Sequence, residues 1–368
     1  MKVSDCRTCE LPSRILVRGV NWVGDSIMTV PAMKALRQMF ASSHITFWVP
    51  ESLESLLRVS RIPDEIITIP PQMSRLSRPF KMASILRSKG FGLVIHFQNA
   101  FESALTSWLA RIPIRVGYPT DGRGPLLNVR VPLTKHIKEQ HQVYYYLEIV
   151  KFLGEYFGLR NRIANGEPDC SIGLNRSISH NVECLLKSYH VENGQRPIIC
   201  LCPGSVNSDA KRWSLDYFSA LADMLIERMD ALVLFMGAAS ETDLINSIIC
   251  SMTNRRAFNL AGKTDLEQSM GVMSFSDLVI SNDTGSAHLA VAAGSKILTI
   301  FGPTIPGATA PFGKQAQIIK GQATCAPCRH FTCPLPDHPC MRSITPELVF
   351  EKTISMIGSK NEPHGTTN

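Results

Sequence analysis

The feature that most constrains the fold is an alternation of short apolar runs with amphipathic segments of roughly ten residues. In the first half of the chain, β-branched and aromatic residues dominate the apolar runs, which predicts strands; these are residues 14–19, 44–49, 65–69 and 93–97. The segments between or after them have the apolar spacing and composition of helices; these are residues 31–40, 51–58, 81–89 and 101–110. Such alternation predicts βαβ units and a parallel sheet.

The same pattern restarts in the second half, with strands predicted at residues 197–202, 231–237 and 278–283. A helix is expected to begin near Ser214, and Thr264 with Glu267 has the spacing of a capping box that opens another. Residues 160–177 are rich in turn formers and lack periodicity. We therefore expect an α/β protein with two Rossmann-like domains, residues 1–170 and 171–345, whose parallel sheets face each other across a cleft. A C-terminal helix and a disordered tail should follow in residues 346–368.

The stretch NDTGSAHLAVAAG (282–294) places polar residues between a strand and a small-residue helix. In open α/β sheets, ligands bind beyond the carboxyl ends of strands, where helix N-termini present free N–H groups. Asp283, Thr284 and Gly285 occupy that position, which suits a diphosphate, and Gly294 can end the helix. Two alternatives remain: Asp283 or Thr284 only caps the helix, and His288 is a core histidine.

Two further strand ends carry compatible groups. Ser205 and Lys211 follow the strand at 197–202, and Glu241 follows the strand at 231–237. A hydroxyl and a lysine can hold phosphates, and a carboxylate is a common acceptor for ribose hydroxyls. Each residue alone would be ordinary on a protein surface, but the three strand ends together predict a nucleotide site.

The first half contributes GVNWVGDSIMTVPAMKAL (19–36), directly after the first strand. Its glycines, Gly19 and Gly24, do not have the spacing of a dinucleotide fingerprint. Asp25 stands where a helix starts, so it either projects into the cleft as a general base or caps the helix.

Charge is divided unevenly. Residues 1–160 hold 21 lysines and arginines against 12 acidic residues, whereas the remainder holds 17 against 19. A solvated surface accounts for such a surplus, and so does an anionic partner such as phosphorylated lipid, a membrane surface or nucleic acid. The sequence contains neither a run of about 20 apolar residues nor an N-terminal apolar core, so we expect no membrane span and no signal peptide. The distribution of the eleven cysteines is typical of a reducing cytoplasm.

One cluster of cysteines does not fit the nucleotide-site interpretation. CAPCRHFTCPLPDHPC (325–340) holds Cys325, Cys328, Cys333 and Cys340 within sixteen residues. Four thiolates could hold zinc or an iron–sulfur cluster, although the gaps of two, four and six residues are not those of a familiar metal motif. The alternative is a loop without metal, open to oxidation.

Three motifs in order, NWVGD, PGS…AKRW and NDTGSAHLA…FGP, resemble glycosyltransferase family 9, and within it the ADP-heptose–lipopolysaccharide heptosyltransferases. FQNAFESAL and IPIRVGYPTDGRGPLLN are also similar, so the resemblance runs from about residue 14 to residue 350. It implies the two-domain GT-B fold, with an N-terminal acceptor domain and a C-terminal ADP-heptose domain. The expected product is the lipopolysaccharide inner core with its second heptose.

The resemblance also implies an inverting transfer that needs no metal or other cofactor, and the sequence has no Asp-x-Asp triplet. Asp25 would deprotonate the acceptor hydroxyl, and Lys211 with the N–H groups at Thr284 and Gly285 would stabilise the leaving ADP. The other donor-binding residues would be Ser205, Glu241 for the ribose, Asp283 and His288.

The implied partners are ADP-heptose and a phosphorylated lipid A–Kdo–heptose acceptor. The enzyme would work as a monomer in the cytoplasm, in peripheral contact with the inner membrane. Basic and aromatic residues do not interleave, so no nucleic-acid partner is expected. The alternatives are a heptosyltransferase for another core position (type I or III), a transferase for another nucleotide sugar, and a nucleotide-sugar-binding protein without catalysis.

Overall fold

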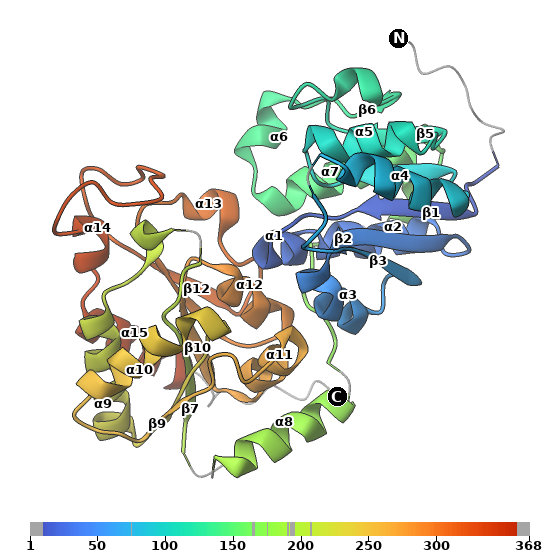
Figure 1. Ribbon diagram of the computed structural model, residues 1–368. Coiled ribbons are helices and arrows are strands. Elements are labelled where there is room, and N and C mark those ends of the chain that lie inside the picture. Colours follow the sequence, from blue (N-terminus) through green and yellow to red (C-terminus); the bar gives the residue numbers. More distant parts are fainter. Residues whose placement is uncertain are drawn as a thin grey trace, which may run out of the picture. The chain divides into compact units, whose positions relative to one another are not determined.

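The computed structural model describes residues 10–74, 76–163, 166–174, 176–189, 191, 196–206 and 208–358 (Figure 1). The chain forms two compact units, Met1–Cys170 and Ser171–Asn368. Each unit contains one six-stranded sheet in which all pairs are parallel. The predicted α/β class with two Rossmann-like sheets, the GT-B plan, is confirmed.

The sheet of the N-terminal unit has the order β3-β2-β1-β4-β5-β6. Its strands are β1 (Arg14–Arg18), β2 (His44–Pro50), β3 (Glu65–Ile69), β4 (Leu93–His96), β5 (Ile114–Gly117) and β6 (Val129–Arg130). Its α-helices are α1 (Val23–Met28), α2 (Val30–Met39), α3 (Glu54–Ser60), α4 (Arg78–Ser88), α5 (Phe101–Leu109), α6 (Lys135–Glu139) and α7 (Gln142–Tyr156). Helix α2 packs on α7, and α4 packs on α5, so two helical layers flank the sheet (Figure 1).

The sheet of the C-terminal unit has the order β12-β11-β10-β7-β8-β9. Its strands are β7 (Ile198–Cys202), β8 (Leu232–Phe235), β9 (Ala257–Asn259), β10 (Leu278–Asn282), β11 (Ile297–Phe301) and β12 (Ala316–Lys320). Its α-helices are α8 (Arg176–Ser188), α9 (Leu215–Met229), α10 (Thr242–Ser251), α11 (Leu266–Phe275), α12 (Gly285–Ala292), α13 (Pro306–Thr309), α14 (Pro339–Arg342) and α15 (Pro346–Gly358). Helix α9 packs against α10 and α15, while α11 packs against α8 and α12.

The central strands are buried along their whole length and mostly apolar, because helices cover both faces of each sheet. Every residue of β4, β7, β10 and β11 is buried. In both sheets, the first and fourth strands of the unit lie side by side: Ile15 of β1 pairs with Leu93 of β4, and Ile199 of β7 pairs with Leu278 of β10. This neighbouring pair is the topological switch point, where ligands of such folds bind.

Local expectations agree with the structure in most places. Helix α9 begins after Ser214 as its N-cap, and Gly294 follows α12 with a φ of 78°. The capping box was predicted one residue too early: its residues are Asp265 and Gln268, and not Thr264 and Glu267. The carboxylate of Asp265 accepts from the Gln268 N–H at 2.7 Å, because a carboxylate competes well with the preceding hydroxyl for this role.

Two expectations concern the ends of the molecule. Within the described residues, no helix is long and apolar enough to cross a membrane. The predicted C-terminal helix is α15, which packs on α9, and the tail expected to be disordered, residues 359–368, lies outside the described residues.

Candidate functional site

Buried Asn282 ties the two central strand ends of the C-terminal unit together. Its amide nitrogen donates to the carbonyl oxygens of Pro203 at 2.8 Å and Gly204 at 3.2 Å, both beyond β7. Its Oδ1 accepts from the backbone N–H of Trp213 at 3.1 Å. One side chain at the end of β10 therefore fixes the loop after β7, including the segment that carries Lys211.

Lys211 lies at the switch point, against Asp283. Its Nζ is 2.9 Å from Asp283 Oδ2 and donates to the Asp283 carbonyl oxygen at 3.3 Å. The Asp283 side chain is 4% exposed and accepts from Thr304 Oγ1 at 2.7 Å, whereas the Lys211 side chain is 29% exposed. The carboxylate therefore holds the lysine in place, while part of the Lys211 side chain stays exposed.

Helix α12 begins directly beside this pair. Thr284 is its N-cap residue, and no side chain provides a cap hydrogen bond there. The first N–H groups of a helix have no intrahelical acceptor and carry partial positive charge. Gly285 and Ser286 are half-buried at this end, so an anion can reach them, while His288 is buried one turn further along.

Glu241 reaches across the ends of β7 and β8. Its Oε2 accepts from the Ala238 N–H at 2.9 Å. A Cβ atom at Gly204 would lie 1.9 Å from Glu241 Oε1, and one at Gly237 would lie 2.8 Å from Oε2. The carboxylate therefore lies over two strand ends, where only glycine leaves room for it.

Ser205 has a partner within the protein. Its hydroxyl is buried and donates to the Ser208 carbonyl oxygen at 2.8 Å. The Ser205 hydroxyl proton is therefore already engaged in a hydrogen bond within the loop. All the donor-site residues predicted from the sequence lie at one edge of one sheet, namely Ser205, Lys211, Glu241, Asp283, Thr284, Gly285 and His288.

The cysteine-rich loop (325–340) supports the segment that carries Lys211. No feature of the sequence indicated this contact. The carbonyl oxygen of Phe331 accepts from the Ala210 N–H at 3.1 Å and from Ser208 Oγ at 2.9 Å. His338 Nε2 donates to the Ala210 carbonyl oxygen at 2.8 Å. These bonds hold the residue next to Lys211 from both sides.

The four cysteines of that loop are free thiols with different exposure. Cys340 is buried, Cys328 and Cys333 are half-buried, and Cys325 is exposed. Burial first, and then the proximity of the other three, raises the pKa of Cys340. Among the described residues, no group of three or more histidine, cysteine or acidic side chains has an arrangement that could hold a metal ion.

In the N-terminal unit, Asp25 is the third residue of α1, whose N-cap is Trp22. It therefore lies in the first turn, where the helix dipole favours a carboxylate, and it is not the capping residue. Helix α1 packs on α7, and burial together with the Asp25 charge raises the pKa of Tyr146.

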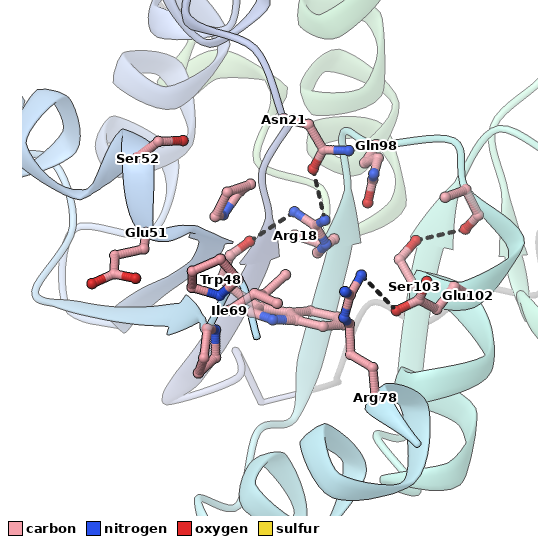
Figure 2. A pocket seen from close by; sticks show the side chains of 14 residues that line it. Arg18, Asn21, Trp48, Glu51, Ser52, Ile69, Arg78, Gln98, Glu102 and Ser103 are labelled. Carbon is pink, nitrogen blue, oxygen red and sulfur yellow. Dashed lines mark hydrogen bonds and ion pairs between the residues drawn. The ribbon is translucent and has the colours of Figure 1, made fainter. Parts of the chain in front are cut away.

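A pocket of about 710 Å³ at the carboxyl edge of the N-terminal sheet was not predicted (Figure 2). Its lining includes Arg18, Asn21, Trp48, Arg78, Gln98 and Glu102. Figure 2 shows Arg18 bonded to Asn21, and Arg78 paired with Glu102. The available signal was Arg18 itself, a charge at the end of the apolar run RILVRG.

Comparisons with known proteins place this geometry in context. Residues 80–338 match the sequence profile of glycosyltransferase family 9 (heptosyltransferase). The lipopolysaccharide heptosyltransferase 2 of Salmonella typhimurium is 27% identical, over 94% of this chain and 99% of its own. Its Escherichia coli counterpart is 28% identical, over 94% of this chain and 98% of its own. The solved E. coli ADP-heptose lps heptosyltransferase II superposes with a TM-score of 0.80 at 24% identity, covering 95% of this chain and 100% of that one.

Proposed function

Because the chain belongs to glycosyltransferase family 9, the heptosyltransferase family, we propose that it transfers L-glycero-D-manno-heptose from ADP-heptose to the first heptose of the lipopolysaccharide inner core. The protein is a glycosyltransferase. Near full-length similarity to proteins named lipopolysaccharide and lipooligosaccharide heptosyltransferase 2 supports this acceptor over other core positions.

The donor-site proposal rests mainly on the partly exposed side chain of Lys211, whose ammonium group lies against Asp283, directly before the N-cap of α12. Cation and helix N-terminus together suit a diphosphate. As the glycosidic bond to ADP breaks, negative charge grows on the β-phosphate, and donors fixed in advance stabilise it most. In this proposal, Glu241 accepts from the ribose hydroxyls, and Asp283 positions Lys211 through their ion pair.

In the proposed reaction, Asp25 activates the acceptor. A carboxylate in the first turn of α1 can take the proton of the accepting hydroxyl as that oxygen attacks the anomeric carbon. Attack from the face opposite ADP inverts the configuration at that carbon. The proton ends on Asp25, the new bond joins two heptoses, and ADP leaves with the bonding electrons.

For the membrane, we propose a docking surface on α4 and α5. Large apolar side chains are exposed on and beside these two packed helices: Leu76, Phe80, Ile85, Phe101 and Trp108. Exposed basic residues accompany them, namely Lys81, Arg87 and Arg111. Aromatic and basic side chains in this combination suit the interface of an anionic bilayer, so the enzyme would contact the cytoplasmic face of the inner membrane peripherally.

The deciding experiment measures ADP release from ADP-heptose with purified acceptors that carry zero, one or two heptoses. We expect turnover only with one heptose. Turnover with zero or two would assign the enzyme to a different core position. Tight donor binding without ADP release on any acceptor would support a non-catalytic binder, and turnover with another nucleotide sugar alone would refute the donor assignment.

A further inference from the structure

We propose that the cysteine-rich loop (325–340) is a thiol-modification site, in which a peroxide oxidises Cys325 and Cys340 to a disulfide that lowers activity at the donor site. Neither the donor-site residues nor Asp25 uses this loop in the proposed reaction. Formation of the disulfide is independent of the proposed function, whereas its effect on heptose transfer rests on that function.

The loop holds the segment that carries Lys211 from two sides. The Phe331 carbonyl oxygen accepts from the Ala210 N–H at 3.1 Å, and His338 Nε2 donates to the Ala210 carbonyl oxygen at 2.8 Å. Ala210 is the residue directly before Lys211, so its backbone sets the point from which the lysine side chain extends. Both contacts come from residues between the first and the last cysteine of the loop.

The same loop also supports the partner of Lys211. The Arg329 N–H donates to the Pro303 carbonyl oxygen at 2.9 Å. The next residue, Thr304, donates from its hydroxyl to Asp283 Oδ2 at 2.7 Å, and Lys211 Nζ lies 2.9 Å from the same oxygen. The cysteine-rich loop therefore contacts the backbone on both sides of the Lys211–Asp283 ion pair.

The two thiols of the proposed disulfide differ in accessibility. Cys340 is 3% exposed, and a Cβ atom at Gly302 would lie 3.1 Å from its Sγ, so this sulfur is packed against the end of β11. Cys325 is exposed. Burial first, and then the other three thiols of the loop with Cys325 foremost, raises the pKa of Cys340. Cys325 is therefore the thiol that a solute reaches first, and the one with the strongest electrostatic effect on Cys340, as expected for its nearest partner.

The oxidation proceeds in two steps. The Cys325 sulfur attacks one oxygen of hydrogen peroxide, the O–O bond breaks, and a sulfenic acid and one water form. The Cys340 sulfur then attacks the Cys325 sulfur, the S–O bond breaks, and a disulfide and a second water form. The thiols together lose two protons and two electrons, which end in the two waters. An exposed first thiol with a second thiol nearby is the arrangement that such a reaction needs.

The disulfide changes the conformation of the loop. Cys325 and Cys340 are free thiols in the structure, so a bond of about 2 Å between their sulfurs must draw them together. Because Cys340 is buried in α14 and Cys325 is exposed, the movement falls mainly on Cys325 and the residues after it. These residues include Arg329 and Phe331, so the contacts on both sides of the ion pair weaken. A cation that is less well fixed stabilises the leaving diphosphate less.

The test compares reduced protein with protein treated with hydrogen peroxide. Peptide mapping by mass spectrometry should find a disulfide between Cys325 and Cys340 after the treatment. We expect kcat/KM for ADP-heptose to fall about tenfold, as for loss of one or two hydrogen bonds, with little change in KM for the acceptor. Dithiothreitol should restore the activity, because it reduces a disulfide but not a sulfinic or sulfonic acid.

Variants of single cysteines assign the effect. Cys325→Ser should keep the activity of the reduced wild type and lose the response to peroxide. Cys340→Ala should also block the disulfide, and thermal unfolding shows whether this buried change leaves the protein folded. Cys184→Ser and Cys250→Ser are the matched controls, because these cysteines are exposed on α8 and α10, and both variants should respond to peroxide as the wild type does.

Three results would overturn the proposal. One is peroxide sensitivity that persists in Cys325→Ser, and another is a disulfide between any other pair of cysteines. The third is stoichiometric zinc or iron in the purified protein, since thiolates that bind a metal are not the free thiols that this oxidation requires.

A nucleotide titration separates this proposal from the proposed function. If the reduced wild type transfers no heptose to any acceptor, the proposed function fails, and calorimetry then compares the ADP affinity of reduced and oxidised protein. A disulfide between Cys325 and Cys340 that weakens ADP binding supports the proposal without any transfer. A disulfide that leaves both turnover and ADP affinity unchanged would refute it.

Discussion

At the residue scale, Lys211 is expected to act on the leaving group. Charge on the diphosphate grows during bond cleavage, so the ammonium contributes more to the transition state than to the ground state. Lys211→Ala should lower kcat by about 10²–10³-fold. Thr284→Val keeps the shape but removes a hydroxyl, so it should cause a milder loss, mainly in KM for ADP-heptose. Steady-state kinetics with varied donor distinguishes these cases; an effect of Lys211→Ala on acceptor KM alone would place Lys211 outside the donor site.

Asp25 is expected to act on the acceptor. Asp25→Asn retains the size of the side chain and its place in the first turn of α1, but an amide cannot take the proton. Turnover should fall by about 10²–10⁴-fold with ADP affinity unchanged. Single-turnover kinetics and a nucleotide titration measure the two quantities, and near-normal turnover would mean that another group is the base.

The environment of His96 leads to a prediction about the pH dependence of stability. Its side chain is fully buried, and burial first, then the charges of Arg123, Arg18 and Arg115, holds its pKa well below the usual value. Ser107 Oγ donates to the Ala104 carbonyl oxygen at 2.9 Å, so the 3.0 Å bond to His96 must be donated by Nε2–H. The imidazole is therefore neutral in the folded state.

The sign of the pH effect follows from this neutrality. Below about pH 6.5, His96 gains a proton in the unfolded chain but not in the folded one, so acidification favours unfolding by about 1.4 kcal/mol per pH unit. His96→Gln retains an N–H donor without titrating. Denaturant unfolding at pH 7.5 and 5.5 measures how far the free energy of unfolding falls on acidification, and this fall should be smaller for the variant than for wild type. An equal fall in both proteins would show that His96 protonates without unfolding the protein.

At the scale of elements, the proposed donor site depends on glycines that follow the ends of two strands, Gly204 after β7 and Gly237 after β8. A Cβ at Gly204 would lie 1.9 Å from Glu241 Oε1, so Gly204→Ala must displace this carboxylate. We expect KM for ADP-heptose to rise on the order of tenfold, the cost of one hydrogen bond to a charged group, with a smaller effect on kcat. Gly173→Ala is the control, because nothing lies within 4 Å of its Cβ position. Unchanged donor KM in Gly204→Ala would remove Glu241 from the donor site.

Some elements could be predicted from the sequence and others could not. Strands β1, β2, β4, β7, β8 and β10 were found because parallel strands covered on both faces are nearly continuous apolar runs. Edge strand β3 was also found, although its residues are only partly buried, because EIITI is rich in β-branched residues. Strands β5, β6, β9, β11 and β12 were not predicted. Strand β6 has two residues, β9 has three, and β12 has only one buried residue. Strand β11 is a fully buried apolar run like its neighbours, so its sequence carried a signal that was not used. The cysteine-rich loop was recognised as unusual, but its contacts with Ala210 arise from residues more than a hundred positions apart.

At the scale of the whole molecule, the surplus of positive charge in the first 160 residues agrees with the proposed membrane surface on α4 and α5. Replacing Phe80 and Trp108 by serine removes two apolar anchors, which should weaken binding to vesicles with anionic lipid by about tenfold or more. Co-sedimentation measures this, and added salt should weaken the wild type further. Leu348→Ser, which changes an exposed apolar side chain of α15, is the control. Equal binding of all three proteins would exclude this surface.

The sequence by itself determined the two α/β units, the strands of their centres, and the strand ends that carry Asp25, Lys211, Glu241 and Asp283. These features can be read from neighbouring residues. A strand that is covered on both faces is an apolar run in the sequence, and the polar residues after it lie at its carboxyl end. Only the tertiary structure decided that Asp283 pairs with Lys211, that Ser205 is bonded within its own loop, and that Arg18, Trp48 and Arg78 line one pocket. Those relations depend on which strand lies beside which, and residues distant in the sequence contact each other only after the sheet has set that order.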